Sequence, residues 1–197
     1  SDDGRAKVEN YCQWIRAKEI PIDGFVLTEH RQFDTSSDYS TLARKYDLLI
    51  LKGSEVETEY GHVLIFGVSE TLTKRIDFTR VDLPLKDVLE LSLACDAIAV
   101  PCHPGRPKVG MFAHTDRLGL PEGVEIVETR NGGSRDDEDQ IALRNAALHK
   151  YRGIGGSDSH IVSHIGRCAT KFTREISSMK ALVKELKIGN FEAVSFK

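Results

Sequence analysis

The chain has 197 residues, enough for one sizeable hydrophobic core, and we expect a single domain over residues 1–197. Its 40% hydrophobic and 29% charged residues are ordinary for a globular protein, and no apolar run approaches the ~20 residues that span a membrane. The formal net charge of -3 provides no basic field, so we expect a small substrate and no stable nucleic-acid binding. The 4 scattered cysteines indicate neither a disulfide framework nor a zinc ribbon, and they favour a reducing, cytoplasmic location.

Helical and extended patterns follow one another along the first half of the chain. Val8, Cys12 and Ile15 recur at helical spacing, which predicts a first helix that Asp2 or Asp3 caps. The segments predicted after it are a strand over 24–27, a short helix around 42–46, extended runs over 48–56 and 62–68, a helix over 85–95 and a strand over 97–100.

The second half continues this alternation after a loop rich in Pro and Gly over 101–108. Its predicted segments are a strand over 124–127, a helix over 141–150, a strand end over 153–156, a strand near 169–172, a helix near 179–186 and a strand over 191–196. Such an order predicts an α/β fold with a mainly parallel sheet, closed or nearly closed as a barrel. In these folds the loops after the strands share one face, where active sites are built.

Acids and histidines follow several short apolar runs at positions where strands are expected to end. His30 follows the run 25–27, Glu55 the run 48–51, and His103 the run 98–100, while Asp158 and His160 follow the glycines at 155–156. Asp158 and His160 point the same way because side chains of a strand alternate with period two. Taken singly, each histidine could equally be a structural residue bonded to backbone. Together, mixed carboxylate and imidazole donors indicate a site for Zn, Mn or Fe.

Short segments carry these residues in a characteristic order. They read Thr28-Glu29-His30, Gly53-Ser54-Glu55, Gly61-His62, His103-Pro104-Gly105-Arg106, Glu128-Thr129-Arg130-Asn131 and Gly156-Ser157-Asp158-Ser159-His160. In this order they resemble the PHP family, the polymerase and histidinol phosphatase domain of metal-dependent phosphoesterases. The resemblance covers nearly the whole chain. It implies a distorted seven-stranded β/α barrel, similar to a TIM barrel, that holds two or three divalent metal ions.

The resemblance also implies a role for individual residues. It makes Glu55 the bridge between the first and second ions and Asp158 a ligand of the first, and it makes Arg106 the partner of the substrate phosphate. The remaining implied ligands are His62 and His103 for the second ion, and His30, His160 and either Asp2 or Asp3 for the third. On this reading Glu55, Asp158 and Arg106 take part in catalysis.

One departure from the family concerns the start of the chain. The family opens with His-x-His shortly before a Ser-Asp-Gly segment, whereas this chain begins Ser1-Asp2-Asp3-Gly4. We therefore expect the first strand to be missing or truncated, and the natural protein to carry a short upstream segment with His-x-His. A Met codon directly before Ser1 would contradict this.

The function predicted from these residues is hydrolysis of a phosphoester, either a small phosphomonoester or a nucleotide or oligonucleotide phosphodiester, by a metal-activated water. An alternative is a metal-binding scaffold of the same fold with reduced or no catalysis. A third is a related barrel hydrolase that acts on C–N bonds. Arg106 could also be an ordinary surface arginine, and Cys102 is interpreted as a buried thiol rather than a ligand. Glu128 and Asn131 are candidate pocket residues. The sequence leaves the oligomeric state and the general acid open.

Overall fold

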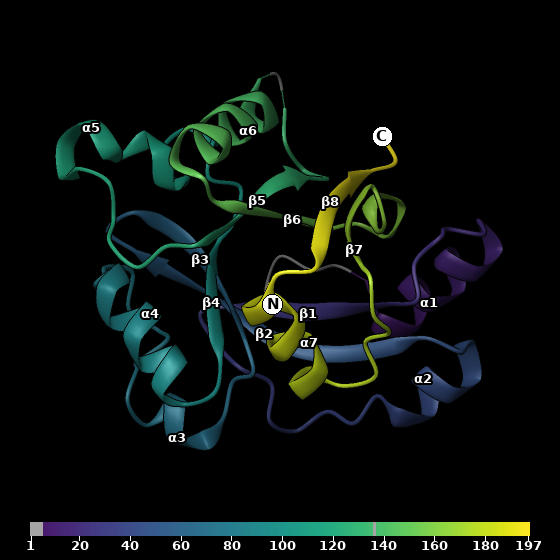
Figure 1. Cartoon of the computed structure of the whole chain (residues 1–197). Coiled ribbons are helices and arrows are strands. Elements are labelled where there is room, and N and C mark those ends of the chain that lie inside the picture. Colours follow the sequence, from purple (N-terminus) through teal and green to yellow (C-terminus); the bar gives the residue numbers. More distant parts are fainter. Residues whose placement is uncertain (1–5, 136) are drawn as a thin grey trace.

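The computed structural model describes residues 6–135 and 137–197 (Figure 1). Asp2 and Asp3, predicted as a helix cap and as metal ligands, lie outside the described residues. The helices are α1 (Val8–Ala17), α2 (Ser40–Tyr46), α3 (Glu70–Thr73), α4 (Leu85–Ala94), α5 (Thr115–Leu118), α6 (Glu138–His149) and α7 (Met179–Ile188), with short 3-10 turns η1 (Met111–Ala113) and η2 (Val162–His164). The strands are β1 (Gly24–His30), β2 (Leu49–Thr58), β3 (Gly61–Phe66), β4 (Ile98–Pro101), β5 (Ile126–Asn131), β6 (Arg152–Gly156), β7 (Cys168–Phe172) and β8 (Phe191–Ser195).

This order confirms the mixed α/β fold that the alternation of patterns predicts. The described strands form one four-stranded sheet, in the order β1-β2-β3-β4, and two pairs, β5-β6 and β7-β8. Only β1 with β2 and β5 with β6 are parallel. The expected mainly parallel sheet is therefore wrong, and the described residues form no closed barrel of hydrogen-bonded strands.

The turn between β2 and β3 explains the loss of parallel order. Glu59 and Tyr60 alone connect these two strands, so the chain reverses at once and no helix crosses over. Gly61 permits the reversal with a φ of 102°, in the left-handed region that a side chain disfavours. A Cβ at Gly61 would also lie 2.1 Å from the carbonyl oxygen of Val109.

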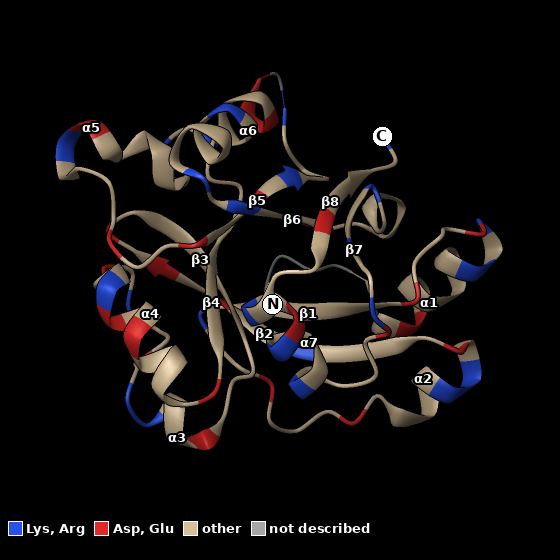
Figure 2. Ribbon diagram, viewed as in Figure 1, with Lys and Arg blue, Asp and Glu red and all other residues tan. Residues whose placement is uncertain are grey.

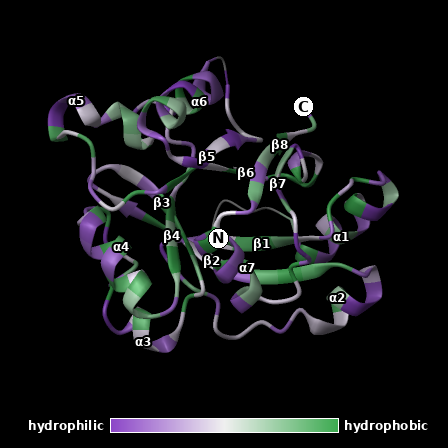
Figure 3. Ribbon diagram, in the orientation of Figure 1, coloured by the Kyte–Doolittle hydropathy of each residue, from purple (hydrophilic) through white to green (hydrophobic). Residues whose placement is uncertain are grey.

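The four-stranded sheet is buried on both faces around β3. Val63 and Ile65 point into a cluster with α4, whereas Leu64 and Phe66 point into a second cluster with α7. Hydrophobic colour accordingly concentrates on β1, β2 and β4 in Figure 3. The helices carry most of the blue and red charged segments in Figure 2. Among the described residues, no helix combines the length and the apolar character needed to cross a membrane.

The first helix forms as the sequence predicts, and it buries the face that carries the apolar residues. Cys12 and Ile15 are fully buried, and they pack with Leu48 and Ile165 in a third, smaller cluster. The contact with Ile165 matters for the site because it fixes the segment after β6, in which two predicted ligands lie.

Candidate metal centre

The strand register brings three predicted ligands close together on the neighbouring strands β1, β2 and β3. His30, the last residue of β1, is the direct partner of Glu55 in β2. His62 stands opposite Glu57, which shares a face of β2 with Glu55. His62 lies near the start of its strand, and it comes close to Glu55 because β3 runs antiparallel to β2, so that the start of β3 lies beside the end of β2. Glu55 also lies inside its strand rather than beyond its end, unlike the sequence interpretation.

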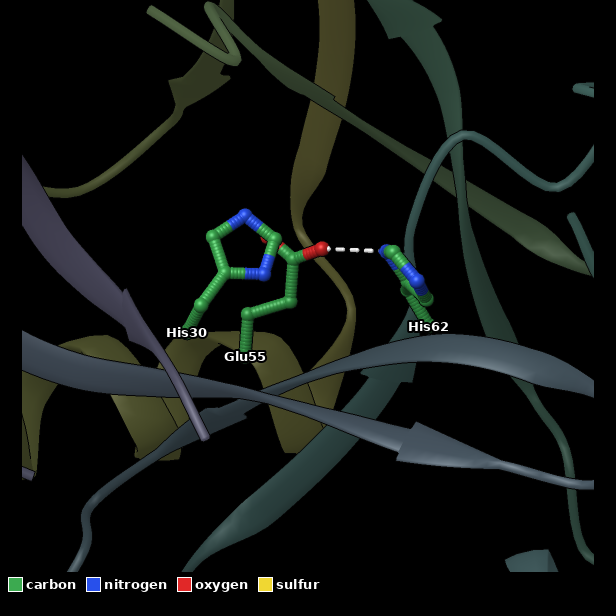
Figure 4. A group of neighbouring side chains, drawn as sticks. All are labelled: His30, Glu55 and His62. Carbon is green, nitrogen blue, oxygen red and sulfur yellow. Dashed lines mark hydrogen bonds and ion pairs between the residues drawn. The ribbon is translucent and has the colours of Figure 1, made fainter. Parts of the chain in front are cut away.

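Glu55 lies between His30 and His62 at the centre of the cluster (Figure 4). Its Oε1 is 2.7 Å from Nδ1 of His62 and 3.5 Å from Nε2 of His103. Its Oε2 is 3.8 Å from Nε2 of His30. His103 joins the group because the backbone N–H of Cys102 donates to the carbonyl of His62, which holds the end of β4 beside β3. Three imidazoles from different strands and loops thus converge on one carboxylate.

The surroundings keep this carboxylate ionised. Glu55 is only 5% exposed, and burial by itself would raise its pKa. Hydrogen bonds with His103 and His62 and the charge of His30 outweigh burial, so the pKa of Glu55 is lowered overall. A buried, ionised carboxylate among imidazoles is a donor set that suits a divalent transition metal.

His103 has a ring nitrogen that lacks a hydrogen-bond partner among the described residues. This atom, Nδ1, is buried, and such an unpaired group costs about 1–3 kcal/mol. The backbone of His103 is also in the left-handed region, with a φ of 32°. A non-glycine residue in this region costs a further 1–2 kcal/mol or so. An unpaired buried imidazole nitrogen in a constrained backbone fits a metal ligand.

Glu128 and Asn131 hold His103 in this conformation. Oε2 of Glu128 accepts hydrogen bonds from the backbone N–H of His103 and from Nδ2 of Asn131, each at 2.8 Å. Burial raises the pKa of Glu128 to about 7, although the charge of His103 and these hydrogen bonds oppose the rise. The two residues that the sequence indicated as candidate pocket residues therefore position a predicted ligand.

Two groups of side chains each have ligand atoms close enough together to hold one metal ion. His30, Glu55 and His62 supply one group, and Glu55, Cys102 and His103 supply the other, with the ligand atoms of each group within 4.8 Å of one another. Cys102 is 2% exposed, in keeping with a buried thiol, and its Sγ lies 3.4 Å from Nε2 of His103. Glu55 belongs to both groups, which is the arrangement a bridging carboxylate requires.

Asp158 and His160 form the other side of the centre, beyond the end of β6. The ring of His160 lies 6.0 Å from the ring of His30, and its Nδ1 is 3.6 Å from Oδ1 of Asp158. Asp158, like His103, has a left-handed backbone, with a φ of 46°. Its Oδ2 accepts a hydrogen bond from Nη2 of Arg106 at 2.7 Å. The structure thus places the predicted phosphate partner against a predicted metal ligand.

A cavity of about 590 Å³ opens beside Asp158 and His160. It is lined by residues from the loops after β4, β5 and β6, namely Arg106, Gly132, Gly133, Ser134, Arg135, Glu138, Asp158, His160, Ile161, His164 and Arg167. Arg135 and Arg167 could not be identified from the sequence, because a single arginine in a loop carries no spacing signal. The position of Arg135 in the loop that follows Asn131, at the end of a strand, was the available indication.

Comparison with known proteins supports the resemblance seen in the sequence. Residues 138–191 match the family described as PHP-associated. Among solved structures, PsfC from Pseudomonas syringae is 14% identical with a TM-score of 0.63, over 95% of this chain and 82% of that one. A two-domain protein from Bacteroides vulgatus containing a predicted PHP-like metal-dependent phosphoesterase is 19% identical with a TM-score of 0.60, over 99% of this chain and 62% of that one.

A third similar structure is the lesion-specific endonuclease PfuEndoQ from Pyrococcus furiosus. It is 14% identical with a TM-score of 0.65, over 98% of this chain and 55% of that one. The chain thus spans little more than half of this enzyme. A comparison with curated proteins found no match. At these identities the likeness to solved structures is one of fold. The match of residues 138–191 to the PHP-associated family agrees with the resemblance that the order of the segments indicates.

Proposed function

We propose that the chain hydrolyses a phosphoester, with two or three divalent metal ions held by the cluster around Glu55. The observation that carries this proposal is the position of Glu55, which belongs to both groups of candidate ligands. The similarity in fold to a protein with a predicted PHP-like metal-dependent phosphoesterase and to an endonuclease supports metal-dependent phosphoester hydrolysis in general terms. The substrate is proposed to be small and phosphorylated, either a phosphomonoester or a nucleotide or oligonucleotide phosphodiester, and the location to be cytoplasmic.

The donor set favours particular ions. Imidazole and carboxylate together suit Zn, Mn or Fe better than Mg or Ca, which prefer sites built from oxygen alone. When bound, such ions lower the pKa of a water toward about 7 and stabilise the charge that develops on a phosphoryl group. His30, His62 and His103 can act as ligands in their neutral form, each with a nitrogen lone pair.

The side chains of the chain itself orient this chemistry. Glu55 supplies negative charge at the centre of the cluster, and its burial excludes water from one side of the site. Oε2 of Glu128 accepts a hydrogen bond from the backbone N–H of His103 at 2.8 Å and so fixes the position of this residue. Arg106 holds Oδ2 of Asp158 and leaves its Oδ1 turned toward His160. The proposed role of Arg106 is thus to orient Asp158 in addition to any contact with phosphate.

Two measurements on one preparation test the proposal. Elemental analysis gives the number of Zn, Mn or Fe ions per chain, and a colorimetric assay measures p-nitrophenol released from the monoester p-nitrophenyl phosphate and from the diester bis(p-nitrophenyl) phosphate. Metal together with hydrolysis of either phosphoester supports the proposal. Metal without turnover on either substrate would favour the scaffold, and release of ammonia from amide or amidine substrates without phosphoester hydrolysis would favour a C–N hydrolase.

A further inference from the structure

The cavity beside the metal centre contains more positive charge than the proposed hydrolysis of one phosphate uses. Three arginines line it, Arg106, Arg135 and Arg167, and its wall includes Asp158 and His160 of the proposed metal centre. A volume of about 590 Å³ lies in the range of small-molecule sites, roughly 300 to 1,000 Å³. The cavity is therefore large enough for part of a substrate that extends beyond the ions.

Arg106 is already neutralised by the protein. Its Nη2 donates to Oδ2 of Asp158 at 2.7 Å and to Oδ1 of Asn131 at 3.2 Å. Its Nε lies 3.7 Å from Oε2 of Glu138. With two carboxylates around it and only 25% of its side chain exposed, Arg106 has little capacity left for an anion from solution.

Arg135 and Arg167 are different, because neither side chain forms an ion pair or hydrogen bond with the described residues. Glu138, the acid of this loop that lines the cavity, uses its Oε2 to accept from the backbone N–H of Arg135 at 3.0 Å, and the same oxygen faces Arg106. The two carboxylates in the lining are thus already engaged. Two guanidinium groups in the cavity thus remain without an ion pair to the described residues.

The backbone around Arg167 makes room for its side chain. Gly132 faces it, and a Cβ at Gly132 would lie 3.0 Å from Cβ of Arg167 and 2.4 Å from the carbonyl oxygen of Ser157. On its other side Arg167 lies near His164, whose pKa is lowered by burial and further by the charge of Arg167. The neighbours of Arg167 in the cavity are therefore a glycine turn and the imidazole of His164.

We propose that Arg135 and Arg167 bind a second phosphate of the substrate, next to the phosphate that is hydrolysed. This inference rests on the proposed function and narrows its substrate class to compounds with two phosphate groups. Guanidinium groups bind phosphate oxygens bidentately, with charge-assisted hydrogen bonds, and an uncompensated pair suits a doubly charged group. The second phosphate belongs either to a small bisphosphate or to the next nucleotide of a strand end.

The test compares substrates that differ only in the second phosphate. An alkanediol bisphosphate is set against the alkyl monophosphate of the same length, and a 5′-phosphorylated dinucleotide against the same 5′-phosphorylated dinucleotide with a neutral methylphosphonate in place of the internucleotide phosphate. The variants are Arg135→Ala and Arg167→Ala. Arg144→Ala is the matched control, because Arg144 is exposed on α6 and lies outside the cavity lining.

The wild-type protein should have a higher kcat/KM for the compound with two phosphates in at least one of these pairs. Each arginine variant should reduce that preference roughly tenfold or more, whereas Arg144→Ala retains it. The pair that shows the effect identifies the source of the second phosphate. An unchanged preference in both arginine variants, or an equal loss in Arg144→Ala, would overturn the proposal.

A binding measurement separates this inference from the proposed function. Titration calorimetry follows the alkanediol bisphosphate binding to protein without added metal, where no turnover is needed. Binding to wild type that is lost in the Arg135→Ala, Arg167→Ala double variant supports the second-phosphate site even if no phosphate is ever released. Equal binding to wild type and double variant contradicts it whatever the enzyme assays give.

Discussion

Nη2 of Arg106 lies 2.7 Å from Oδ2 of Asp158, so a predicted substrate-binding group and a predicted metal ligand are joined directly. The side chains are 25% and 11% exposed, and solvent screens this pair only in part. Asp158 is held with one oxygen toward Arg106 and the other toward His160. The pair links the cavity to the metal centre, because Arg106 lines the one and Asp158 is a candidate ligand of the other.

Replacement of Arg106 by alanine should consequently do more than weaken substrate binding. Arg106→Ala removes the hydrogen bond to Asp158 and leaves Oδ1 of Asn131 with the backbone N–H of Gly133 as its donor, and we expect a loss of about 2 kcal/mol in the free energy of unfolding. It should also lower kcat, since Asp158 is no longer oriented. Urea denaturation and steady-state kinetics measure the two effects. Arg144→Ala serves as control, and a variant that raises KM alone would show that Arg106 acts only on the substrate.

Glu55 should decide whether the centre holds metal at all. Glu55→Ala removes the carboxylate common to both ligand groups, and we expect metal content and activity to be lost together, with kcat reduced at least a hundredfold. Elemental analysis of the purified variant checks this. Glu90→Gln, an exposed position on α4, should leave the metal content unchanged. Full occupancy in Glu55→Ala would refute the bridging role.

Asp34 should make the loop before α2 sensitive to acid. Its Oδ1 accepts from the backbone N–H groups of Ser36 and Ser37 at 2.9 and 3.0 Å, and hydrogen bonds from Ser37 and Ser36 lower the pKa of Asp34 below its ordinary value of about 4. A lowered pKa in the folded state stabilises the fold above pH 4 or so, and that contribution is lost as the pH falls below it.

Asp34→Asn should therefore reduce stability at pH 7 by about 1 kcal/mol and flatten the decline of Tm between pH 4 and pH 2 or so. Thermal unfolding followed by circular dichroism across this range is the measurement. Among the described residues the exposed Asp82 pairs only with Arg80, so Asp82→Asn is a suitable control. An identical pH profile for wild type and Asp34→Asn would show that the turn contributes no acid-sensitive stability.

Local patterns in the sequence identified nearly every helix and strand that shapes the site, because apolar periodicity reports burial of one face. Cys12 and Ile15 on α1 and the strand over 24–27 are examples, and the structure confirms both. The direction of β3 was missed. It depends on the two-residue turn before Gly61, whose geometry is set by contact with Val109, far along the chain.

In the candidate site, too, the sequence identified individual residues but not the contacts between distant loops. His30, Glu55, His62 and His103 were identified from residue type and position, and the structure brings them together. Their assignment as metal ligands remains a prediction. The pairing of Arg106 with Asp158 and the uncompensated charges of Arg135 and Arg167 could not be predicted, since they depend on which loop side chains meet across the cavity.

Gly61 offers a test of how tightly the fold positions His62. Gly61→Ala must adopt a φ of 102° and place its Cβ 2.1 Å from the carbonyl oxygen of Val109, so the turn has to shift. Strain at φ alone costs about 1–2 kcal/mol, and the clash with backbone adds to it. Gly119→Ala separates the cost of the backbone conformation from the cost of the clash, because Gly119 has a φ of 80° and a Cβ added there would have no atom within 4 Å.

We therefore expect Gly61→Ala to lose about 3 kcal/mol or more in the free energy of unfolding, and Gly119→Ala only about 1 kcal/mol. Gly61→Ala should also bind metal more weakly, since His62 follows directly and donates its backbone N–H to Val109 at 2.9 Å. Urea denaturation and metal titration of both variants give the comparison. Equal destabilisation by the two substitutions would mean that the contact with Val109 does not constrain the turn that carries His62.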